Sequence, residues 1–188
     1  MKKTMLVAAM FLAAASTVQA QSIVKPFSFG VSGGAAIPTG KSGDIATTGF
    51  NLTGLSEYHA PGLPVTLRGE LSYDRLGIKD LPSDMDGHHS ILSGVVSAVR
   101  VFGATPTLKP YMIAGAGVYN VKSTVSQGGI SVSESRTAPG LNGGMGLNFS
   151  LAGMSTFAEA RYHYAFTKNV DKGWENTQSI PLVFGFRF

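Results

Sequence analysis

The sequence predicts an all-β protein: an eight-stranded antiparallel up-and-down transmembrane β-barrel, preceded by a cleavable signal peptide. Three observations support this. The 188 residues include 24 glycines and 9 prolines but only 14% charged residues, which fits one folded domain with many turns. Apolar side chains recur at every second position in many stretches, which is the period of a β-strand. Short and long connections alternate between these stretches, as they do in a membrane barrel.

The N-terminal segment is predicted to be a signal peptide. A lysine pair precedes an apolar run from Met5 to Ala15, and small residues lead up to the cleavage expected after Ala20. The run is too short for a membrane helix, which needs roughly 20 apolar residues. We therefore assign residues 1–20 to the signal peptide and 21–188 to an outer-membrane barrel domain.

The first three predicted strands show the alternation directly. In residues 27–37 large apolar side chains occupy most odd positions, and serine, glycine or alanine occupy the even ones. Residues 49–58 carry Glu57 opposite their apolar face. In residues 65–75 leucines and a tyrosine alternate with charged and hydroxyl side chains. A slip of one residue would reverse the two faces, so the register is well specified.

Five more stretches complete the barrel, at residues 90–102, 108–121, 137–149, 156–166 and 178–188. Most of the eight are close to the roughly 9–11 residues of a tilted strand that crosses a bilayer. Ordinary globular strands average about five or six residues. The lengths therefore favour a membrane barrel.

The connections are expected to differ between the two ends. Long external loops on a rigid barrel commonly carry binding sites. Trp174, the only tryptophan, lies in one of them and could be a contact anchor or an interfacial residue. The short connections are 59–64, 103–107 and 150–155, and the long polar ones are 38–48, 76–89, 122–136 and 167–177.

Charged side chains within the strands are predicted to line the lumen, because they lie opposite the large apolar side chains. Small polar-face residues suit a narrow interior, whereas an exported soluble barrel or sandwich would turn its apolar face inward. Four acids and four bases balance, so we expect ion pairs and a plugged, non-conducting lumen, with Glu70 and Glu159 accepting from Arg68 and Arg161. The predicted lumen charges are Glu57, Arg68, Glu70, Asp74, Arg100, Glu159, Arg161 and Arg187.

Aromatic residues near strand ends are expected to form the interfacial girdles of a membrane barrel. They are Phe27, Tyr58, Tyr73, Tyr111, Tyr119, Phe149 and Phe166.

Three stretches resemble the small outer-membrane β-barrel domain family, whose architecture is related to the OmpA, OmpX and opacity-protein barrels. They are Lys109-Pro110-Tyr111 followed by Ala114-Gly115-Ala116-Gly117-Val118-Tyr119, then Ala158-Glu159-Ala160-Arg161-Tyr162-His163-Tyr164, and the ending Pro181-Leu182-Val183-Phe184-Gly185-Phe186-Arg187-Phe188. The resemblance implies insertion by the outer-membrane assembly machinery, which reads an aromatic C-terminal strand, here Phe184, Phe186 and Phe188. It does not specify an activity.

An enzyme remains an alternative, because some small outer-membrane barrels modify lipid A. A deacylase of this kind resembles a serine hydrolase, with a histidine, a nearby serine and an orienting acid. The candidates are His88-His89-Ser90 beside a loop and His163 without a serine two residues on. We expect both to be non-catalytic, and we predict that the protein is not an enzyme and holds no cofactor.

The loop 76–89 contains several potential metal ligands, but a calcium loop beginning at Asp84 would need a glutamate where Val95 stands. We expect a solvated loop and no metal site, and the alternative is a weak affinity for divalent cations or for lipopolysaccharide bridged by them. The potential metal ligands in this loop are Asp80, Asp84, Asp86, His88 and His89.

A narrow passage for small solutes or apolar ligands is a third class of function. With Arg100 assigned to the lumen, the lumen face of strands 90–102 and 108–121 is unusually apolar, unless a bulge near Pro110 shifts the register. That face would comprise Leu92, Val96, Met112, Ala114, Ala116 and Val118.

The predicted role is a structural or surface-interacting outer-membrane protein. Without cysteine the chain has no disulfide, thiol or lipid anchor. After signal cleavage the basic surplus is only 13 − 11 = 2, too small to argue for nucleic acid. The expected partners are outer-membrane lipid and lipopolysaccharide, the assembly machinery and a host or envelope surface. We expect a monomer in the bacterial outer membrane.

Overall fold

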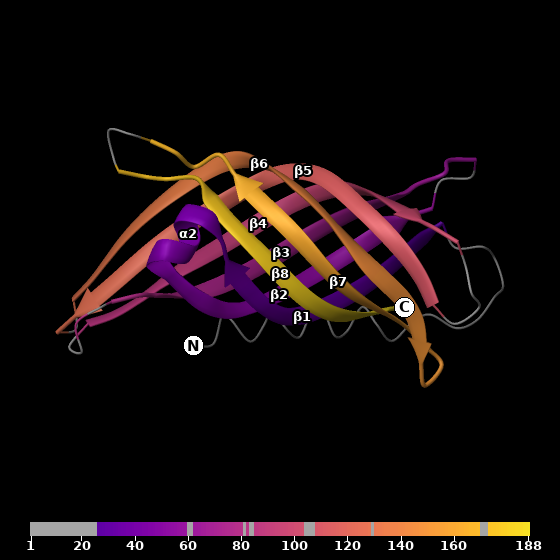
Figure 1. Cartoon of the computed structure of the whole chain (residues 1–188), viewed down its shortest axis with the longest axis horizontal. Helices are drawn as coiled ribbons and strands as arrows, with labels where there is room; N and C mark the ends of the chain where they lie inside the picture. Colours follow the sequence, from indigo (N-terminus) through magenta and orange to yellow (C-terminus); the bar gives the residue numbers. More distant parts are fainter. Residues whose placement is uncertain are drawn as a thin grey trace.

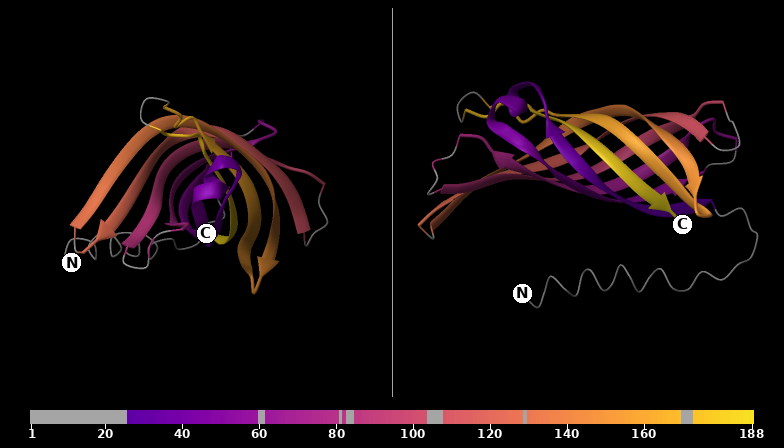
Figure 2. Two further views of the ribbon diagram at one scale, coloured as in Figure 1. Left: turned by 60° about the vertical axis from the view of Figure 1, so that its left-hand side comes forward. Right: turned by 60° about the horizontal axis from the view of Figure 1, so that its bottom comes forward.

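The computed structural model describes residues 26–59, 62–80, 82, 85–103, 108–128, 130–169 and 173–188. Eight antiparallel strands form a closed barrel in which each pairs with its neighbours in the chain and β1 closes against β8. Figures 1 and 2 show the tilted strands winding around one long axis. The predicted fold class and topology are confirmed. The predicted signal peptide, residues 1–20, lies outside the described residues.

Every predicted stretch forms a strand. A short helix, α2 (Gly40–Ile45), joins β1 to β2. Among the described residues, no helix combines the length and hydrophobicity needed to cross a membrane. The strands are β1 (Phe27–Pro38), β2 (Ala46–Tyr58), β3 (Thr66–Ile78), β4 (Met85–Val101), β5 (Leu108–Gln127), β6 (Ile130–Leu151), β7 (Met154–Ala165) and β8 (Thr177–Arg187).

The two ends of the barrel differ as expected. β6 and β7 are joined by Ala152 and Gly153, whose positive φ angles of 51° and 80° suit a tight hairpin turn. The C-terminus lies at this end, and α2 lies at the opposite end (Figure 1). In a membrane barrel the end with short turns is periplasmic and the other end is external.

The prediction that residues 122–136 form an external loop is wrong, because most of them form a β-hairpin between β5 and β6. β4, β5 and β6 all run beyond their predicted external ends. The apolar alternation that reveals a membrane strand stops there, and hydroxyl side chains bond across the pair instead. Thr124 and Ser133 hydroxyls are 3.0 Å apart, and those of Ser126 and Ser131 are 2.7 Å apart. Backbone pairing therefore continues along these strands beyond the alternating apolar residues from which strands are recognised in a sequence.

The outer wall of the barrel is apolar and the lumen is polar. Leu71, Val96 and Met145 are 59%, 65% and 64% exposed, whereas Arg68 is fully buried inside. Alternation alone fits either orientation, and the small size of the polar-face residues predicted the one that the structure shows. A soluble barrel packs its apolar side chains inward, so this arrangement fits a barrel surrounded by lipid.

The predicted orientation of β4 and β5 is wrong. Arg100 is exposed on the outer wall, and Val99 beside it is buried in the lumen. The β5–β6 register passes Pro110 without a shift, and the β4–β5 register is continuous up to Tyr111, so no bulge is involved. A cation at a strand end can face the lipid headgroups, so Arg100 was a poor indicator of the inner face. The apolar side chains that were assigned to the lumen therefore face outward, and the solute passage loses its support: Leu92, Val96, Met112, Ala114, Ala116 and Val118.

Two predicted girdle residues also face the other way. Tyr111 and Tyr119 are 1% and 2% exposed and lie inside the barrel. On β5 they share the inward face with Ile113 and Val121, because β5 has the opposite orientation to the one predicted.

Candidate functional site

A plug of charged side chains fills the periplasmic half of the lumen. Arg68 on β3 lies at its centre, with its two terminal nitrogens each 2.7 Å from a carboxylate oxygen, one of Glu57 on β2 and one of Glu159 on β7. Glu70, two positions along β3, is 3.7 Å away. These contacts join opposite walls of the barrel through buried charges.

Arg161 on β7 makes the reciprocal contact. Its Nη2 donates to Glu70 across the lumen at 2.9 Å, and its Nε donates to Glu159 on its own strand at 3.0 Å. Each arginine thus binds the glutamate two positions away on its own strand and the glutamate beside the other arginine. The crossed arrangement places alternating charges side by side, which offsets the cost of taking them out of water.

Polar and aromatic groups complete the plug towards the periplasm. Arg187 on β8 approaches Glu57 at 3.1 Å and donates to the Asn148 side chain at 2.7 Å. The Tyr111 hydroxyl donates to Glu159 at 2.7 Å. The Arg187 guanidinium carbon lies 4.4 Å from the centre of the Phe157 ring, a cation–π distance.

Small residues make room for these large groups. A side chain at Gly146 on β6 would place its Cβ 2.3 Å from the Tyr111 ring. Glycine is therefore required where Tyr111 crosses the lumen, because no ordinary side chain fits within that distance. The glycine-rich polar face of the sequence reflects this need.

The structure brings together six of the eight predicted lumen charges. Three acids, Glu57, Glu70 and Glu159, balance three arginines, Arg68, Arg161 and Arg187. Asp74 is also in the lumen, but it lies towards the external side, apart from the plug, and accepts from Asn51. Arg100 is outside the barrel, contrary to the prediction.

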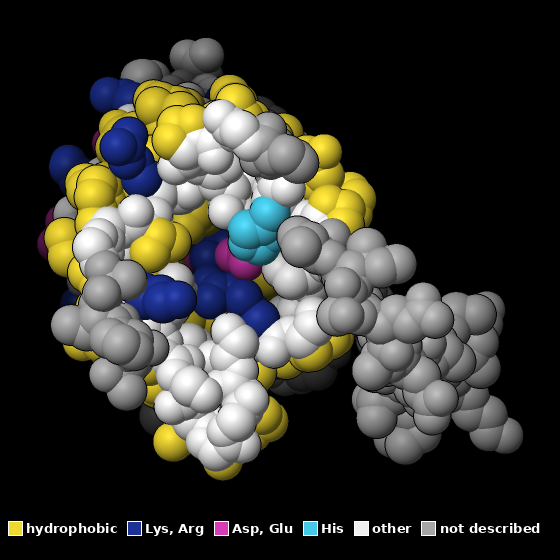
Figure 3. Space-filling model, turned by 90° about the vertical axis from the view of Figure 1, so that its right-hand side faces the viewer, with side chains coloured by type: hydrophobic (Ala, Val, Ile, Leu, Met, Phe, Trp, Pro, Cys, Tyr) yellow, Lys and Arg dark blue, Asp and Glu magenta, His cyan; other side chains and the backbone are white. Residues whose placement is uncertain are grey.

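The sequence pattern placed Asn142 and Asn148 on the polar lumen face but did not reveal that they accept from Arg161 and Arg187. It gave no sign that Tyr111 and Phe157 contact the plug. Figure 3 looks into the periplasmic end and shows basic and acidic side chains gathered in the opening, with hydrophobic side chains around much of the rim.

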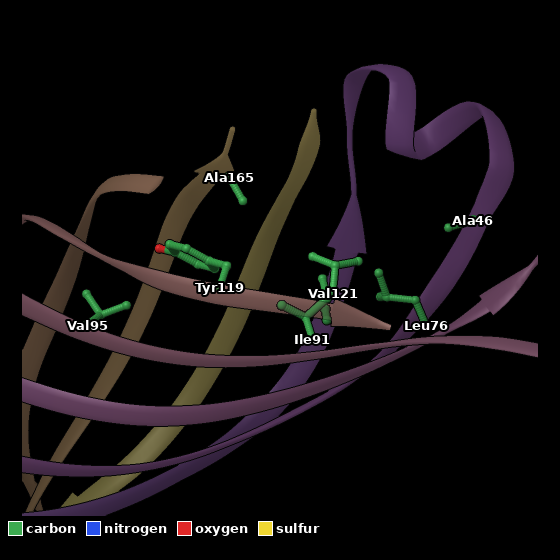
Figure 4. Packing of buried hydrophobic residues seen from close by; sticks show 8 residues of the cluster. Ala46, Leu76, Ile91, Val95, Tyr119, Val121 and Ala165 are labelled. Atoms are coloured by element: carbon green, nitrogen blue, oxygen red, sulfur yellow. The ribbon is translucent and has the colours of Figure 1, made fainter. Parts of the chain in front are cut away.

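The external half of the lumen is closed by apolar side chains. Leu76, Ile91, Val121 and Tyr119 belong to one buried cluster, and they project into the barrel in Figure 4. Trp174 packs against this cluster and borders a cavity of about 280 Å³ at the mouth. Trp174 is therefore in the mouth of the barrel and not in a girdle on its wall.

The three histidines among the enzyme candidates do not share one site. The external part of β4 alternates, so His88 and Ser90 share the outer face while His89 lines the mouth cavity. The Ser90 hydroxyl is 3.1 Å from that of Tyr73, and Nδ1 of His88 is 3.5 Å from an Arg75 nitrogen. Among the described side chains, no carboxylate lies within ion-pair distance of His88. His163 packs edge-on against the Tyr119 ring inside the lumen.

Potential metal ligands do not converge in the part of the chain that the structure describes. Asp84 lies outside the described residues, while Asp80, Asp86, His88 and His89 lie within them.

The C-terminal phenylalanines lie on the outer wall at the periplasmic end. Phe184 and Phe186 are neighbours, with ring centres 5.2 Å apart. Phe188 exchanges two backbone hydrogen bonds with Phe29 on β1, at 2.9 and 3.1 Å. The last residues thus complete the seam between β8 and β1.

The closed barrel, its apolar wall and its plugged polar lumen define an integral outer-membrane β-barrel protein. The chain belongs to the outer membrane protein beta-barrel domain family, whose model matches residues 5–188. The family indicates the bacterial outer membrane as its location. No curated protein matches the chain significantly.

Solved structures agree on the fold. Neisserial surface protein A is 24% identical, covers 87% of this chain and 96% of its own, and superposes with a TM-score of 0.62. A major outer-membrane protein of Thermus thermophilus is 13% identical over 87% of this chain and 100% of its own, with a TM-score of 0.61. Ail, the attachment invasion locus protein of Yersinia pestis, is 22% identical over 87% and 100%, with a TM-score of 0.51.

Substitution of Arg161 by alanine should lower the free energy of unfolding by about 3–5 kcal/mol, because it leaves Glu70 and Glu159 buried without one of their cations. Urea unfolding of the protein refolded in lipid vesicles measures this. Arg100→Ala removes the same charge from the outer wall and should change the stability by less than about 1 kcal/mol. Equal losses in the two variants would contradict the crossed ion pairs. Both variants should still insert into the membrane.

The plugged lumen should not conduct ions. An eight-stranded barrel is only wide enough for side chains to fill, and here charged groups bridge it from wall to wall. Planar-bilayer recordings of the refolded protein should therefore show no stable, porin-sized current steps. Such steps in the wild-type protein would mean that the charges line an open channel.

Proposed function

We propose that the protein is a non-enzymatic, monomeric outer-membrane barrel, exported through its signal peptide, that binds an extended protein strand on a host or envelope surface through its external sheet. The observation that carries this proposal is the unpaired edge of β6. The barrel supplies a rigid support, and the edge supplies the backbone groups for strand addition.

The edge begins where β7 ends. β6 pairs with β7 from Gly140 opposite Ala165 towards the periplasm. Beyond that, the Phe166 amide donates to the carbonyl of Pro139 and the Arg136 side chain donates to that of Lys168. One edge of residues 130–138 is hydrogen-bonded to β5. No described strand pairs with the other edge, which continues the β7 side of β6. Unpaired backbone donors and acceptors on an exposed strand are a template for another strand.

Side chains of the hairpin support the same role. Ile130 and Val132 are 74% and 71% exposed and share one face with Val125 of β5. The opposite face carries serine and threonine hydroxyls. An apolar strip beside an open edge can select a partner strand through its alternate side chains.

A proline at position 133 should weaken surface binding. Odd-numbered residues of this stretch direct their backbone groups to the open edge, as Pro139 does towards Phe166. Ser133→Pro therefore removes one edge donor and keeps the β5–β6 ladder. Adhesion of cells displaying the protein to an epithelial monolayer, and to one another, should fall severalfold.

The matched control is Ser133→Ala, which loses the hydroxyl but keeps the backbone donor and should bind like the wild type. Heat-dependent gel mobility shows that both variants still form the barrel. If Ser133→Pro and removal of residues 123–134 leave adhesion unchanged, strand addition at this edge is wrong.

A lipid-modifying enzyme is the second candidate, because His88 and Ser90 both belong to the outward face of β4. The neighbour of His88 is the Arg75 cation, whereas a catalytic histidine is oriented by an acid. We therefore expect mass spectra of lipid A to show the same acyl chains with and without the gene product. If lipid A lacks an acyl chain in the strain that makes the wild-type protein and keeps it in a strain that makes Ser90→Ala, the protein is an enzyme instead.

We further propose that the assembly machinery reads the aromatic face of β8, formed by Phe184, Phe186 and Phe188. Its support is that these rings lie outward on the last strand, where they are accessible before the barrel closes against β1.

A further inference from the structure

Two cations flank one position on the outer wall at the external end. Arg75 on β3 and Lys122 on β5 lie on either side of Ser90 on β4, and the strand registers pair each of them with it directly. Both cations are exposed, and the neighbouring residues Asp74 and Val121 are buried in the lumen. Three adjacent strands therefore present two positive charges to the surroundings of the barrel and not to its interior.

The height of this pair relative to the membrane follows from β4. Between Ser90 and Arg100, the outward residues are Leu92, Gly94, Val96 and Ala98. Ten residues of a tilted strand rise roughly 25 Å along the membrane normal, the height of the apolar band of an outer-membrane barrel. Ser90 therefore lies at the external boundary of the hydrocarbon and Arg100 at the periplasmic boundary.

Aromatic residues mark the same boundary. Tyr73, one outward position below Arg75, has its hydroxyl 3.1 Å from that of Ser90 and its ring centre 6.2 Å from that of Phe50. Tyrosine rings favour the headgroup level of a membrane, where one end is apolar and the other is hydrated. The two cations thus lie at the plane of the lipid headgroups.

Neither cation forms an ion pair with a carboxylate of the described residues. The ion pairs among the described residues all lie in the lumen and involve neither Arg75 nor Lys122. His88 is 3.5 Å from Arg75 and adds a polar nitrogen. Asp86 lines the same groove as Arg75 and His88, further from the hydrocarbon. The pair therefore has a free positive charge directed at the headgroups.

We propose that Arg75 and Lys122 bind a phosphate group of the glycolipid in the outer leaflet, the phosphorylated lipid A of lipopolysaccharide. The planar guanidinium suits bidentate contact with a phosphate, and the lysine ammonium adds a second positive charge across Ser90. The hydroxyls of Tyr73 and Ser90 lie between them as further donors. Binding here would fasten the barrel into one leaflet and would not depend on the proposed strand partner.

The test uses the full barrel in detergent micelles, titrated with bisphosphorylated lipid A and with the same lipid after removal of its phosphates, with binding measured by native mass spectrometry. The wild-type protein should prefer the phosphorylated lipid. Arg75→Ser and Lys122→Ser should each weaken that preference about fivefold, and the double variant about 25-fold.

Arg100→Ser is the matched control, because it removes an outward cation from the opposite boundary and should leave the preference unchanged. Heat-dependent gel mobility confirms that each variant is folded. An equal loss with Arg100→Ser would mean non-specific attraction and overturn the proposal. Equal binding of the two lipids would also overturn it. A preference that is lost both with EDTA and in Asp86→Asn would overturn it as well, because a bridging divalent cation would then hold the lipid.

Discussion

The structure depends on the crossed ion pairs that hold Arg68 and Arg161 against three glutamates in a narrow lumen. A charge buried alone in such a space would cost several kcal/mol, so each arginine needs an acid from its own strand and one from the opposite wall. These ion pairs connect β2 and β3 to β7 across the lumen. The requirement also explains the surrounding composition, since Tyr111 reaches Glu159 only because Gly146 leaves it space. A lumen filled in this way holds the strands of the barrel together through side chains that reach from wall to wall.

A filled lumen leaves three surfaces for function. The external mouth is closed by apolar residues around Trp174, the extended hairpin of β5 and β6 exposes a strand edge, and the outer wall touches lipid. The plug holds the strands so that these surfaces keep a fixed geometry. Arg100 and Arg75 illustrate how position decides the role of a cation. Both face outward, but they lie at opposite boundaries of the apolar band and so meet different leaflets.

Membership of the barrel family and the likeness to Neisserial surface protein A establish the architecture of this chain. At 24% identity they do not carry a partner from one barrel to another, because the same scaffold supports different surfaces. The features particular to this chain are the length of its hairpin, the open edge beside Pro139 and the cations around Ser90.

The eight strands, their order and most of their periplasmic ends could be predicted from the sequence, because an alternating pattern of apolar residues is a local property. The same pattern showed which charges share a face on β3 and β7, and so Arg68, Glu70, Glu159 and Arg161 could be placed together. Alternation alone does not say which face is external, but the small size of the polar-face residues predicted a polar lumen and an apolar outer wall. The folded barrel overruled the sequence pattern on two points. It reversed β4 and β5, because a charge at a strand end such as Arg100 can face either lumen or headgroups. It also extended the hairpin past residue 121, where backbone pairing across strands continues although the hydrophobic signal has stopped. In each case the deciding energy comes from contacts between strands, which are distant in the sequence and become defined only when the barrel closes.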